Sequence, residues 1–278
     1  MRVQVSLRAL HQFQFSYEEG DDIMRLSLRV FCFALALGVV AACSTAIAQE
    51  KNDADKLYNE GNARYKSGNY QGAIEKYTEA LNIVGDYRYH YQRGLSYKNS
   101  RQYDRAVSDF EAAISLKKDF AIGFNALGGV HLLVGDYDKS IESFKLAAKN
   151  DPRLDRSRKG IGEAYAGKAQ QLLDAGKFEG AGVLLDEALT EHSENAKLYL
   201  IAARVYNRLE NAEKSISSAQ EAIKLKKRGA MGAEYFELGI GYKKLNDFEK
   251  ARAAFMEAKK DPTYSRNAQY ELDGLKGR

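Results

Sequence analysis

The sequence contains no tryptophan, only two prolines and only two cysteines among its 278 residues. With prolines at Pro152 and Pro262 alone, long stretches hold nothing that breaks a helix. Both cysteines, Cys32 and Cys43, lie near the N-terminus, so the rest of the chain has no disulfide and no thiolate metal ligand. β-Branched residues never alternate with polar ones over a useful run, and this composition predicts helix almost throughout.

The chain also lacks a strong excess of charge of one sign. Its formal net charge is +4, from 42 Lys and Arg against 38 Asp and Glu. A dedicated nucleic-acid-binding protein depends on a concentrated basic surface. We therefore expect no nucleic-acid partner.

Catalytic and metal-binding patterns are missing as well. His90, His131 and His192 have no second histidine or carboxylate at the spacing of metal ligands, so we interpret them as packing residues. Gly162–Lys168 fits the GxxxxGK spacing of a phosphate-binding loop, but Ala169 stands where the hydroxyl of Ser or Thr should hold Mg²⁺. No strand precedes this segment, and we predict that it lies inside a helix. No enzyme activity, metal or cofactor is expected.

What the sequence does contain is a repeated pattern. An aromatic residue is followed at +3 by a small residue, at +7 by a second aromatic and at +10 by alanine, so that all four share one helix face. The copies are Tyr70, Ala73, Tyr77, Ala80; Tyr103, Ala106, Phe110, Ala113; Tyr137, Ser140, Phe144, Ala147; and Phe248, Ala251, Phe255, Ala258. The first three begin at residues 70, 103 and 137, and a period of this size indicates a solenoid of stacked units.

This pattern resembles the tetratricopeptide repeat over roughly residues 54–262. The resemblance implies an all-α, right-handed superhelical solenoid of about six helix-turn-helix repeats within residues 49–278, in which a Gly or Ala at the eighth position of each first helix lets the second helix approach. A short capping helix with a polar outer side is expected at 265–275. The repeats are expected near residues 54–86, 87–120, 121–154, 155–195, 196–231 and 232–264.

Two of these repeats depart from the pattern. The first helix of the repeat at 155–195 is predicted to run from about Arg156 to Ala175, roughly two turns longer than is usual in the family. The repeat at 196–231 lacks the aromatic residue of its second helix. We expect the lengthened helix to disturb the regular superhelix near the middle of the array.

The resemblance also implies a partner-binding groove on the concave side. In the family this groove is lined by the second, fifth, ninth and twelfth residues of each first helix. Carried over by position, the groove residues are Tyr58, Asn62, Tyr65, Arg88, Tyr91, Lys98, Asn125, Lys197, Arg204, Asn207, Phe236 and Lys243, with Ile122 beside them. Such a groove is aromatic at its N-terminal end and basic towards its C-terminal end, which suits a peptide or helix with apolar and acidic side chains.

The segment Gly61–Lys66 is similar to the tetratricopeptide class that clamps the C-terminal carboxylate of chaperones. The remaining clamp positions differ in this chain. Tyr58 replaces the lysine of that class, and Gln92 replaces its asparagine. Ile122 and Ala126 replace its basic pair. We therefore do not expect this chain to bind chaperone tails.

Residues 24–48 have the features of a secretory signal peptide. Arg25 and Arg29 precede the apolar run 30–42, which is too short to cross a bilayer comfortably, and Ala46-Ile47-Ala48 forms a small-x-small cleavage site. Residues 1–23 fit neither the signal nor the repeats. We interpret them as a non-translated or disordered extension.

A lipoprotein signal is the alternative interpretation of the same segment. Val40-Ala41-Ala42-Cys43 resembles a lipobox, in which cleavage after Ala42 leaves Cys43 as a lipid-carrying N-terminus, although Val40 stands where leucine is usual. Under either interpretation the protein is exported to the periplasm or outer membrane, or is secreted. Contact with a membrane is expected only through this lipid.

The function predicted from the sequence is that of a non-enzymatic scaffold or adaptor in the bacterial cell envelope, which binds a protein or peptide partner in the groove. Two alternatives stay open. One is an outer-membrane lipoprotein that assists assembly of a pilus or secretion complex. The other is a module that binds cell-wall glycans through its groove tyrosines.

Overall fold

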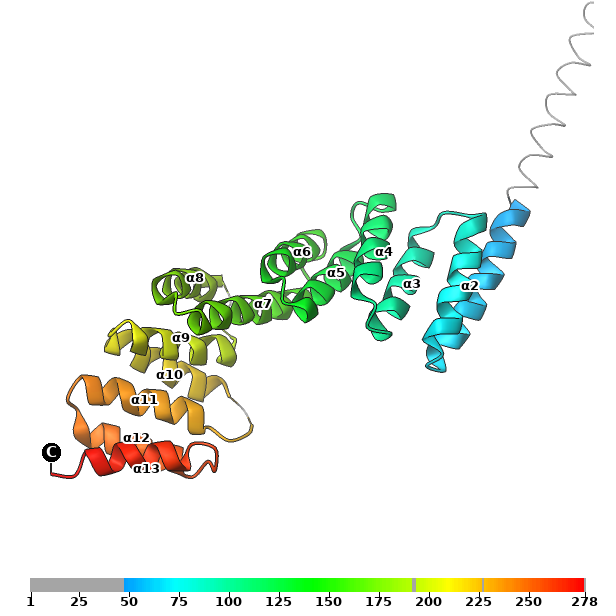
Figure 1. The fold of residues 1–278 in the computed structure, drawn as a ribbon. Helices are drawn as coiled ribbons and strands as arrows, with labels where there is room; N and C mark the ends of the chain where they lie inside the picture. The colour runs from blue at the N-terminus through cyan, green and yellow to red at the C-terminus, as the bar shows by residue number, and fades with distance from the viewer. Residues whose placement is uncertain (1–47, 192–193, 227, 278) are drawn as a thin grey trace, which may run out of the picture.

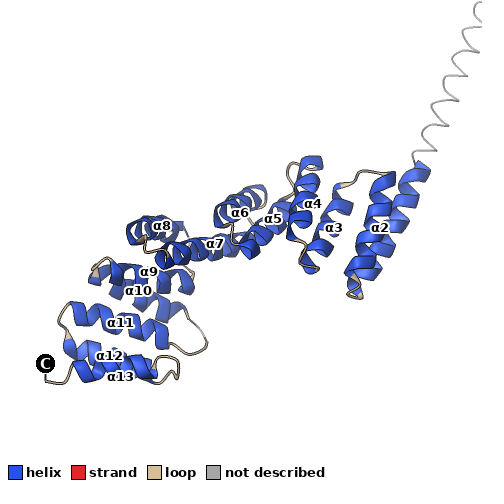
Figure 2. Ribbon diagram, in the orientation of Figure 1, coloured by secondary structure: helices blue, strands red, loops and turns tan. Residues whose placement is uncertain are grey.

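The computed structural model describes residues 48–191, 194–226 and 228–277, and every regular element in them is a helix (Figure 2). The predicted all-α repeat architecture is confirmed. None of these helices is both long enough and apolar enough to cross a membrane. The first described helix spans residues 48–66. It is followed by α2 (Tyr70–Ile83), α3 (Tyr87–Asn99), α4 (Tyr103–Leu116), α5 (Ala121–Val134), α6 (Tyr137–Asn150), α7 (Asp155–Asp174), α8 (Phe178–Glu191), α9 (Ala196–Arg208), α10 (Ala212–Leu225), α11 (Gly232–Lys244), α12 (Phe248–Lys259) and α13 (Ser265–Gly274).

The helices pack as consecutive pairs, each joined by a tight turn (Figure 1). Every turn within a pair contains one residue with a left-handed backbone, and the next residue directly precedes the second helix. At Asn69, Asp136, Asn211 and Asp247 the side chain of that next residue accepts a hydrogen bond from a backbone N–H of the first turn. These bonds satisfy donors that the start of a helix otherwise leaves free.

A glycine in the first helix of four pairs faces the aromatic ring of the second helix. A Cβ atom on Gly94 would lie 2.7 Å from the Phe110 ring, and one on Gly239 would lie 2.5 Å from the Phe255 ring. Gly61 faces Tyr77 and Gly128 faces Phe144 in the same way. The eighth position therefore holds glycine because the ring occupies the space of a side chain.

The other two pairs keep the helices close with different residues. In α7 and α8 the equivalent residues are Ala169 and Leu185, and in α9 and α10 they are Ala203 and Ala219. All four are completely buried. Where the first helix carries alanine in place of glycine, the second helix carries leucine or alanine in place of an aromatic residue. The smaller residue leaves room for the methyl group, so the interior stays close-packed.

Helix α7 contains one extra heptad. The second helix starts 16 residues after the first in α3 and α4 (87 and 103) and in α5 and α6 (121 and 137), but 23 residues after it in α7 and α8 (155 and 178). Seven residues make nearly two turns, so the faces of α7 keep their directions while its far end moves about 10 Å along the axis. The predicted lengthening of this helix is confirmed.

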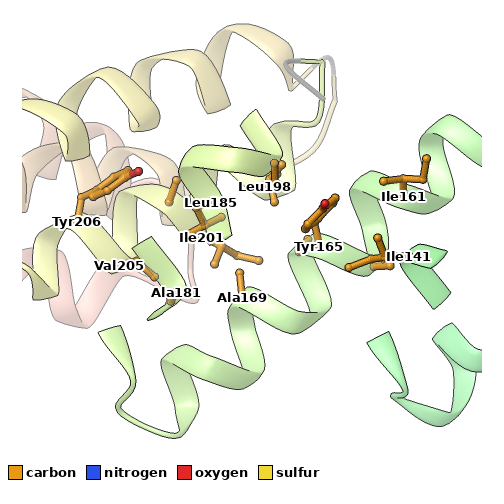
Figure 3. Close-up of a cluster of buried hydrophobic side chains, with 14 of the residues drawn as sticks. Ile141, Ile161, Tyr165, Ala169, Ala181, Leu185, Leu198, Ile201, Val205 and Tyr206 are labelled. Carbon is orange, nitrogen blue, oxygen red and sulfur yellow. The ribbon is translucent and has the colours of Figure 1, made fainter. Parts of the chain in front are cut away.

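The extra heptad divides the array into two stacks (Figure 1). We call the helix at 48–66 with α2 to α6 the N-terminal stack, and α8 to α13 the C-terminal stack. Helix α7 packs on α5 and α6 and also on α8 and α9. A continuous core runs along it from Ile141 of α6 to Leu185 of α8 and Val205 of α9 (Figure 3).

The phosphate-loop spacing at Gly162–Lys168 lies inside α7, as predicted. A Cβ atom on Gly162 would meet the Asn195 side chain at 2.7 Å, and Gly167 lies against the ring of Tyr137. Lys168 forms an ion pair with Asp138. All three residues thus have packing or surface roles here, and no loop exists at this position.

Candidate peptide-binding surface

The first helices of successive pairs lie side by side along each stack. Ser157 of α7 donates a hydrogen bond to the Asn125 side chain of α5 at 3.1 Å, which places the start of α7 beside α5. We define the N-terminal first-helix surface by the residues that these helices carry at the positions expected to line the groove. They are Tyr58, Tyr65, Tyr91, Lys98, Ile122, Asn125 and Arg156.

The tyrosines at the N-terminal end of this surface are held in place by their neighbours. The Tyr58 ring lies 4.9 Å from that of Tyr89 and 5.8 Å from that of Tyr77. The hydroxyl of Tyr65 accepts a hydrogen bond from the Asn99 amide at 2.8 Å. These rings are rigid, half-buried features, and part of each serves the packing between helices.

Two other predicted groove residues are engaged within the N-terminal stack. The Asn62 carbonyl oxygen accepts a hydrogen bond from the buried Tyr77 hydroxyl at 2.8 Å. Arg88 pairs with Asp55 at 3.3 Å and with Asp86 at 2.8 Å. Burial opposes ionisation of Asp86, but the hydrogen bonds from Arg88 outweigh it and lower the pKa of Asp86 to about 2. The charge of Arg88 is therefore already balanced.

An apolar area lies between α3 and α5. The Tyr91 ring is 5.8 Å from the Phe110 ring and 5.2 Å from the Phe120 ring. Ile122 follows at the start of α5 and is 50% exposed. Burial raises the pKa of Tyr91, and the nearby Tyr65 raises it further. A large aliphatic side chain is thus exposed two residues after Phe120, which belongs to this cluster of rings.

Two cations of this surface are unpaired. Within the described residues, neither Lys98 nor Arg156 has an acidic partner within ion-pair distance, while Asp55 of the first described helix is bound by Arg88. Arg156 lies near enough to Tyr91 to favour the ionised form of its phenol. Sequence reasoning missed Arg156, although the positional rule, applied to the first turn of α7, would have found it.

Two of the three cations predicted at the C-terminal end of the groove are paired within the protein. Arg204 lies 3.4 Å from the Glu237 carboxylate and donates a hydrogen bond to the Tyr264 hydroxyl at 3.0 Å. Lys243 pairs with Glu271 of α13 at 2.5 Å. Since both charges are balanced inside the C-terminal stack, they do not form a basic patch.

Asn207 and Phe236 are also engaged in the C-terminal stack. Asn207 is 7% exposed and donates to the Glu237 carboxylate at 2.9 Å, so it belongs to the interior and not to an open surface. The Phe236 ring lies 5.7 Å from the Phe255 ring and 5.6 Å from the Tyr264 ring. These contacts link residues far apart in sequence, which positional rules alone do not reveal.

Lys197 lies apart from the other predicted groove residues. It is exposed and lines a cavity of about 800 Å³ between the first half of α7 and the start of α9. A second cavity of about 450 Å³ lies between α6, α7 and α8. Both flank α7, where the extra heptad shifts one stack away from the other.

The two described histidines have structural surroundings. His90 lies 3.0 Å from the Asp109 carboxylate, which also pairs with Arg93 at 2.8 Å. His131 is buried, and this burial lowers its pKa. His192 and Cys43 lie outside the described residues. In the part of the chain that the structure describes, no three His, Cys, Asp or Glu side chains are grouped closely enough to hold a metal ion.

Comparison with known sequences decides the family. Family models described as tetratricopeptide repeat match residues 54–87, 91–155, 167–230 and 235–260. The chain belongs to the tetratricopeptide repeat family. The glycine–aromatic pairs described above thus lie within tetratricopeptide repeats.

Individual tetratricopeptide relatives match parts of the chain. Small glutamine-rich tetratricopeptide repeat-containing protein 2 of Saccharomyces cerevisiae is 31% identical over 99 residues, which is 35% of this chain and 29% of the relative. The Hsp70-Hsp90 organizing protein of Triticum aestivum is 25% identical over 112 residues, 40% of this chain and 19% of the relative. The chain therefore spans less than a third of the length of either relative. Among solved structures, MamA is similar over 64% of this chain and 93% of its own, with 19% identity and a TM-score of 0.46.

Proposed function

We propose that this tetratricopeptide repeat protein is a non-enzymatic adaptor that binds a peptide or helix of a partner protein on its N-terminal first-helix surface. The observation that carries the proposal is the exposed Ile122, which follows two residues after Phe120, whose ring packs on that of Tyr91. Rigid aromatic rings around an exposed aliphatic residue are typical of the anchor regions of protein interfaces. The name of the Hsp70-Hsp90 organizing protein, a relative over 112 residues, supports a role in protein association.

The charges of the surface favour an acidic partner segment. Lys98 and Arg156 have no acidic partner among the described residues, whereas Arg204 and Lys243 of the C-terminal stack are already paired. An acidic side chain of a partner could pair with either free cation without first breaking an ion pair. We therefore place the acid-binding part of the surface at α3 and α7, not at α9 and α11.

Chaperone tails remain poor candidates for this partner. Tyr58, Gln92, Ile122 and Ala126 occupy the clamp positions, and none of them carries a positive charge. Tyr58 is also held between two other rings. The partner we propose presents an apolar side chain to Ile122, with acidic residues on either side of it.

A pull-down with cross-linking, carried out on extract of the source cells, tests this function. The wild-type chain is compared with Ile122→Glu, in which a charge replaces an exposed side chain and leaves the core unchanged. We expect the wild type to capture a defined protein that Ile122→Glu loses. Val183→Glu is the matched control, because Val183 is 72% exposed on α8, away from the surface.

Two results would contradict the proposal. Equal capture by the wild type and Ile122→Glu would show that the partner binds elsewhere. Equal loss in Ile122→Glu and Val183→Glu would show that any added charge disturbs binding. The helical circular dichroism signal of each variant must match that of the wild type.

We also propose that the protein acts in the cell envelope. This proposal is supported by the signal-like sequence of residues 24–48, which lie outside the described part of the chain apart from Ala48. Separation of the source cells into cytoplasmic, periplasmic and membrane fractions tests it. Recovery of the protein in the cytoplasmic fraction alone would contradict it.

A further inference from the structure

Helix α7 carries the connection between the two stacks. It packs on α5 and α6 of one stack and on α8 and α9 of the other, and among the described helices no other one contacts both stacks extensively. The cavity of about 450 Å³ lies between α6 and α8, on the side of α7 lined by Ile141, Tyr165 and Leu184. The stacks therefore have free space between them on this side.

The middle of α7 is intrinsically weak as a helix. Gly160, Gly162 and Gly167 fall within eight residues, and glycine inside a helix is less favourable than alanine. The rings of Phe144 and Tyr137 occupy the space of a side chain at Gly160 and Gly167, and the Asn195 amide lies 2.7 Å from a Cβ atom placed on Gly162. The packing between α7 and the two stacks thus requires small residues at these positions. The same glycines make α7 easier to bend.

A polar link crosses the same joint. Lys145 of α6 donates a hydrogen bond to the Tyr165 hydroxyl of α7 at 2.9 Å, and that hydroxyl donates to the Glu187 carboxylate of α8 at 3.0 Å. Lys145 also lies 4.0 Å from Glu187 and 3.9 Å from Glu191. Side chains from three successive helices are therefore connected at one edge of the cavity.

We propose that α7 is a flexible joint. Bending at Gly160–Gly167 changes the angle between the stacks, and the Lys145–Tyr165–Glu187 link holds the angle seen in this structure. The ion pairs of Lys145 are partly exposed, so salt weakens them. The buried core along α7 keeps the stacks attached while the angle varies.

Distances between spin labels test the joint. Ser108→Cys on α4 and Ser217→Cys on α10 place one label on each stack, in the full chain with Cys32 and Cys43 changed to serine. A pair at Lys66→Cys and Ser108→Cys, within the N-terminal stack, serves as the rigid reference. We expect the distance distribution between stacks to be broader than the reference and to broaden further in 1 M salt.

Variants of the link identify its role. Lys145→Met keeps the aliphatic stem, and Tyr165→Phe keeps the ring. Each should broaden the distribution between stacks at low salt, and Lys145→Met should also remove most of its response to salt, because it removes the ion pairs with Glu187 and Glu191. Lys149→Met, one turn further along α6, is the matched control, because Lys149 has no ion pair among the described residues.

The result that would overturn the proposal is a distribution between stacks as narrow as the reference at every salt concentration. Broadening by Lys149→Met to the same extent as by Lys145→Met would also overturn it. The distance within the N-terminal stack and the circular dichroism signal show whether a variant has lost its fold. A change in either would assign the broadening to unfolding and would contradict the proposed role of the link.

Discussion

Gly128 and Gly129 are neighbours in α5 with opposite surroundings. A Cβ atom on Gly128 would lie 2.9 Å from two atoms of the Phe144 ring, whereas one on Gly129 would meet nothing within 4 Å. The pair therefore separates the packing role of a repeat glycine from its effect on helix stability.

We predict that Gly128→Ala lowers the free energy of unfolding by about 1–2 kcal/mol, because overpacking outweighs the gain in helix propensity. Gly129→Ala should raise it by about 1 kcal/mol, because there only the gain in helix propensity applies. Urea unfolding followed by circular dichroism measures both. Similar effects of the two substitutions would mean that the ring moves aside at no cost.

The glycine–aromatic positions were predictable from sequence because they recur at a fixed period. The partners of Arg204, Asn207 and Lys243 were not, because Glu237 and Glu271 lie 28 to 33 residues away in the sequence and stand outside the repeated pattern. Position in a repeat thus predicts which way a side chain faces. Whether its charge is free depends on neighbours that the repeat does not specify.

Glu237 makes the stability of the C-terminal stack depend on pH. Burial raises its pKa, and the hydrogen bond from Asn207 and the charge of Arg204 only partly oppose this rise. The folded state therefore holds the proton more tightly than the unfolded state does. The stabilisation from this group is complete below its unfolded pKa and is lost as the pH rises through its folded pKa.

Glu237→Gln should remove this dependence, because the amide keeps the shape and a hydrogen-bond acceptor for Asn207 but cannot ionise. We predict a higher unfolding temperature than wild type at pH 7 and little difference at pH 4. Thermal unfolding at a series of pH values measures it. A lower unfolding temperature for the variant at pH 7 would show instead that the ion pair with Arg204 outweighs burial.

At the scale of single elements, the turns inside the helix pairs differ in the residue that they place at the left-handed position. Three have glycine at the left-handed position, with φ of +71° to +82° at Gly68, Gly135 and Gly176. The turn before α4 instead places Arg101 there at φ +60°, and Gln102 after it makes no capping hydrogen bond. This is a costly conformation for a residue with a Cβ atom.

Arg101→Gly should raise the free energy of unfolding by up to about 1 kcal/mol, because glycine adopts this backbone without steric strain. Ser108→Gly, at an exposed position inside α4, should lower it by about 0.5–1 kcal/mol. Chemical denaturation measures the free energy of unfolding of both variants. It compares glycine in a left-handed backbone with glycine in a helical backbone. A loss of stability in Arg101→Gly would mean that the arginine side chain contributes more than its backbone strain.

The length of α7 was also predictable, since two of its flanking helices could be located from their own repeats. The division into two stacks was harder to foresee. It depends on the extra residues forming a continuous helix instead of a loop, and sequence spacing is compatible with both. The buried alanines and glycines of α7 favour the helix, because as a helix the segment packs against both stacks.

For the whole molecule, the mass of the native protein distinguishes the two processing hypotheses. Cleavage after Ala48 gives a chain that starts at Gln49, whereas the lipoprotein signal gives one that starts at Cys43 and carries a lipid. We expect the first mass in intact-mass spectrometry of protein purified from its source. An uncleaved chain would contradict both hypotheses.

The extra heptad also fixes the rotation of one stack relative to the other. Each residue of an α-helix turns by about 100°, so seven added residues return the second stack to within about 20° of its original direction. An insertion of five residues would instead turn it by about 140° and point the first helices of the two stacks to nearly opposite sides. The number of residues in α7 therefore sets the phase between the stacks, and seven is a number that lengthens the molecule while its two halves keep facing the same way.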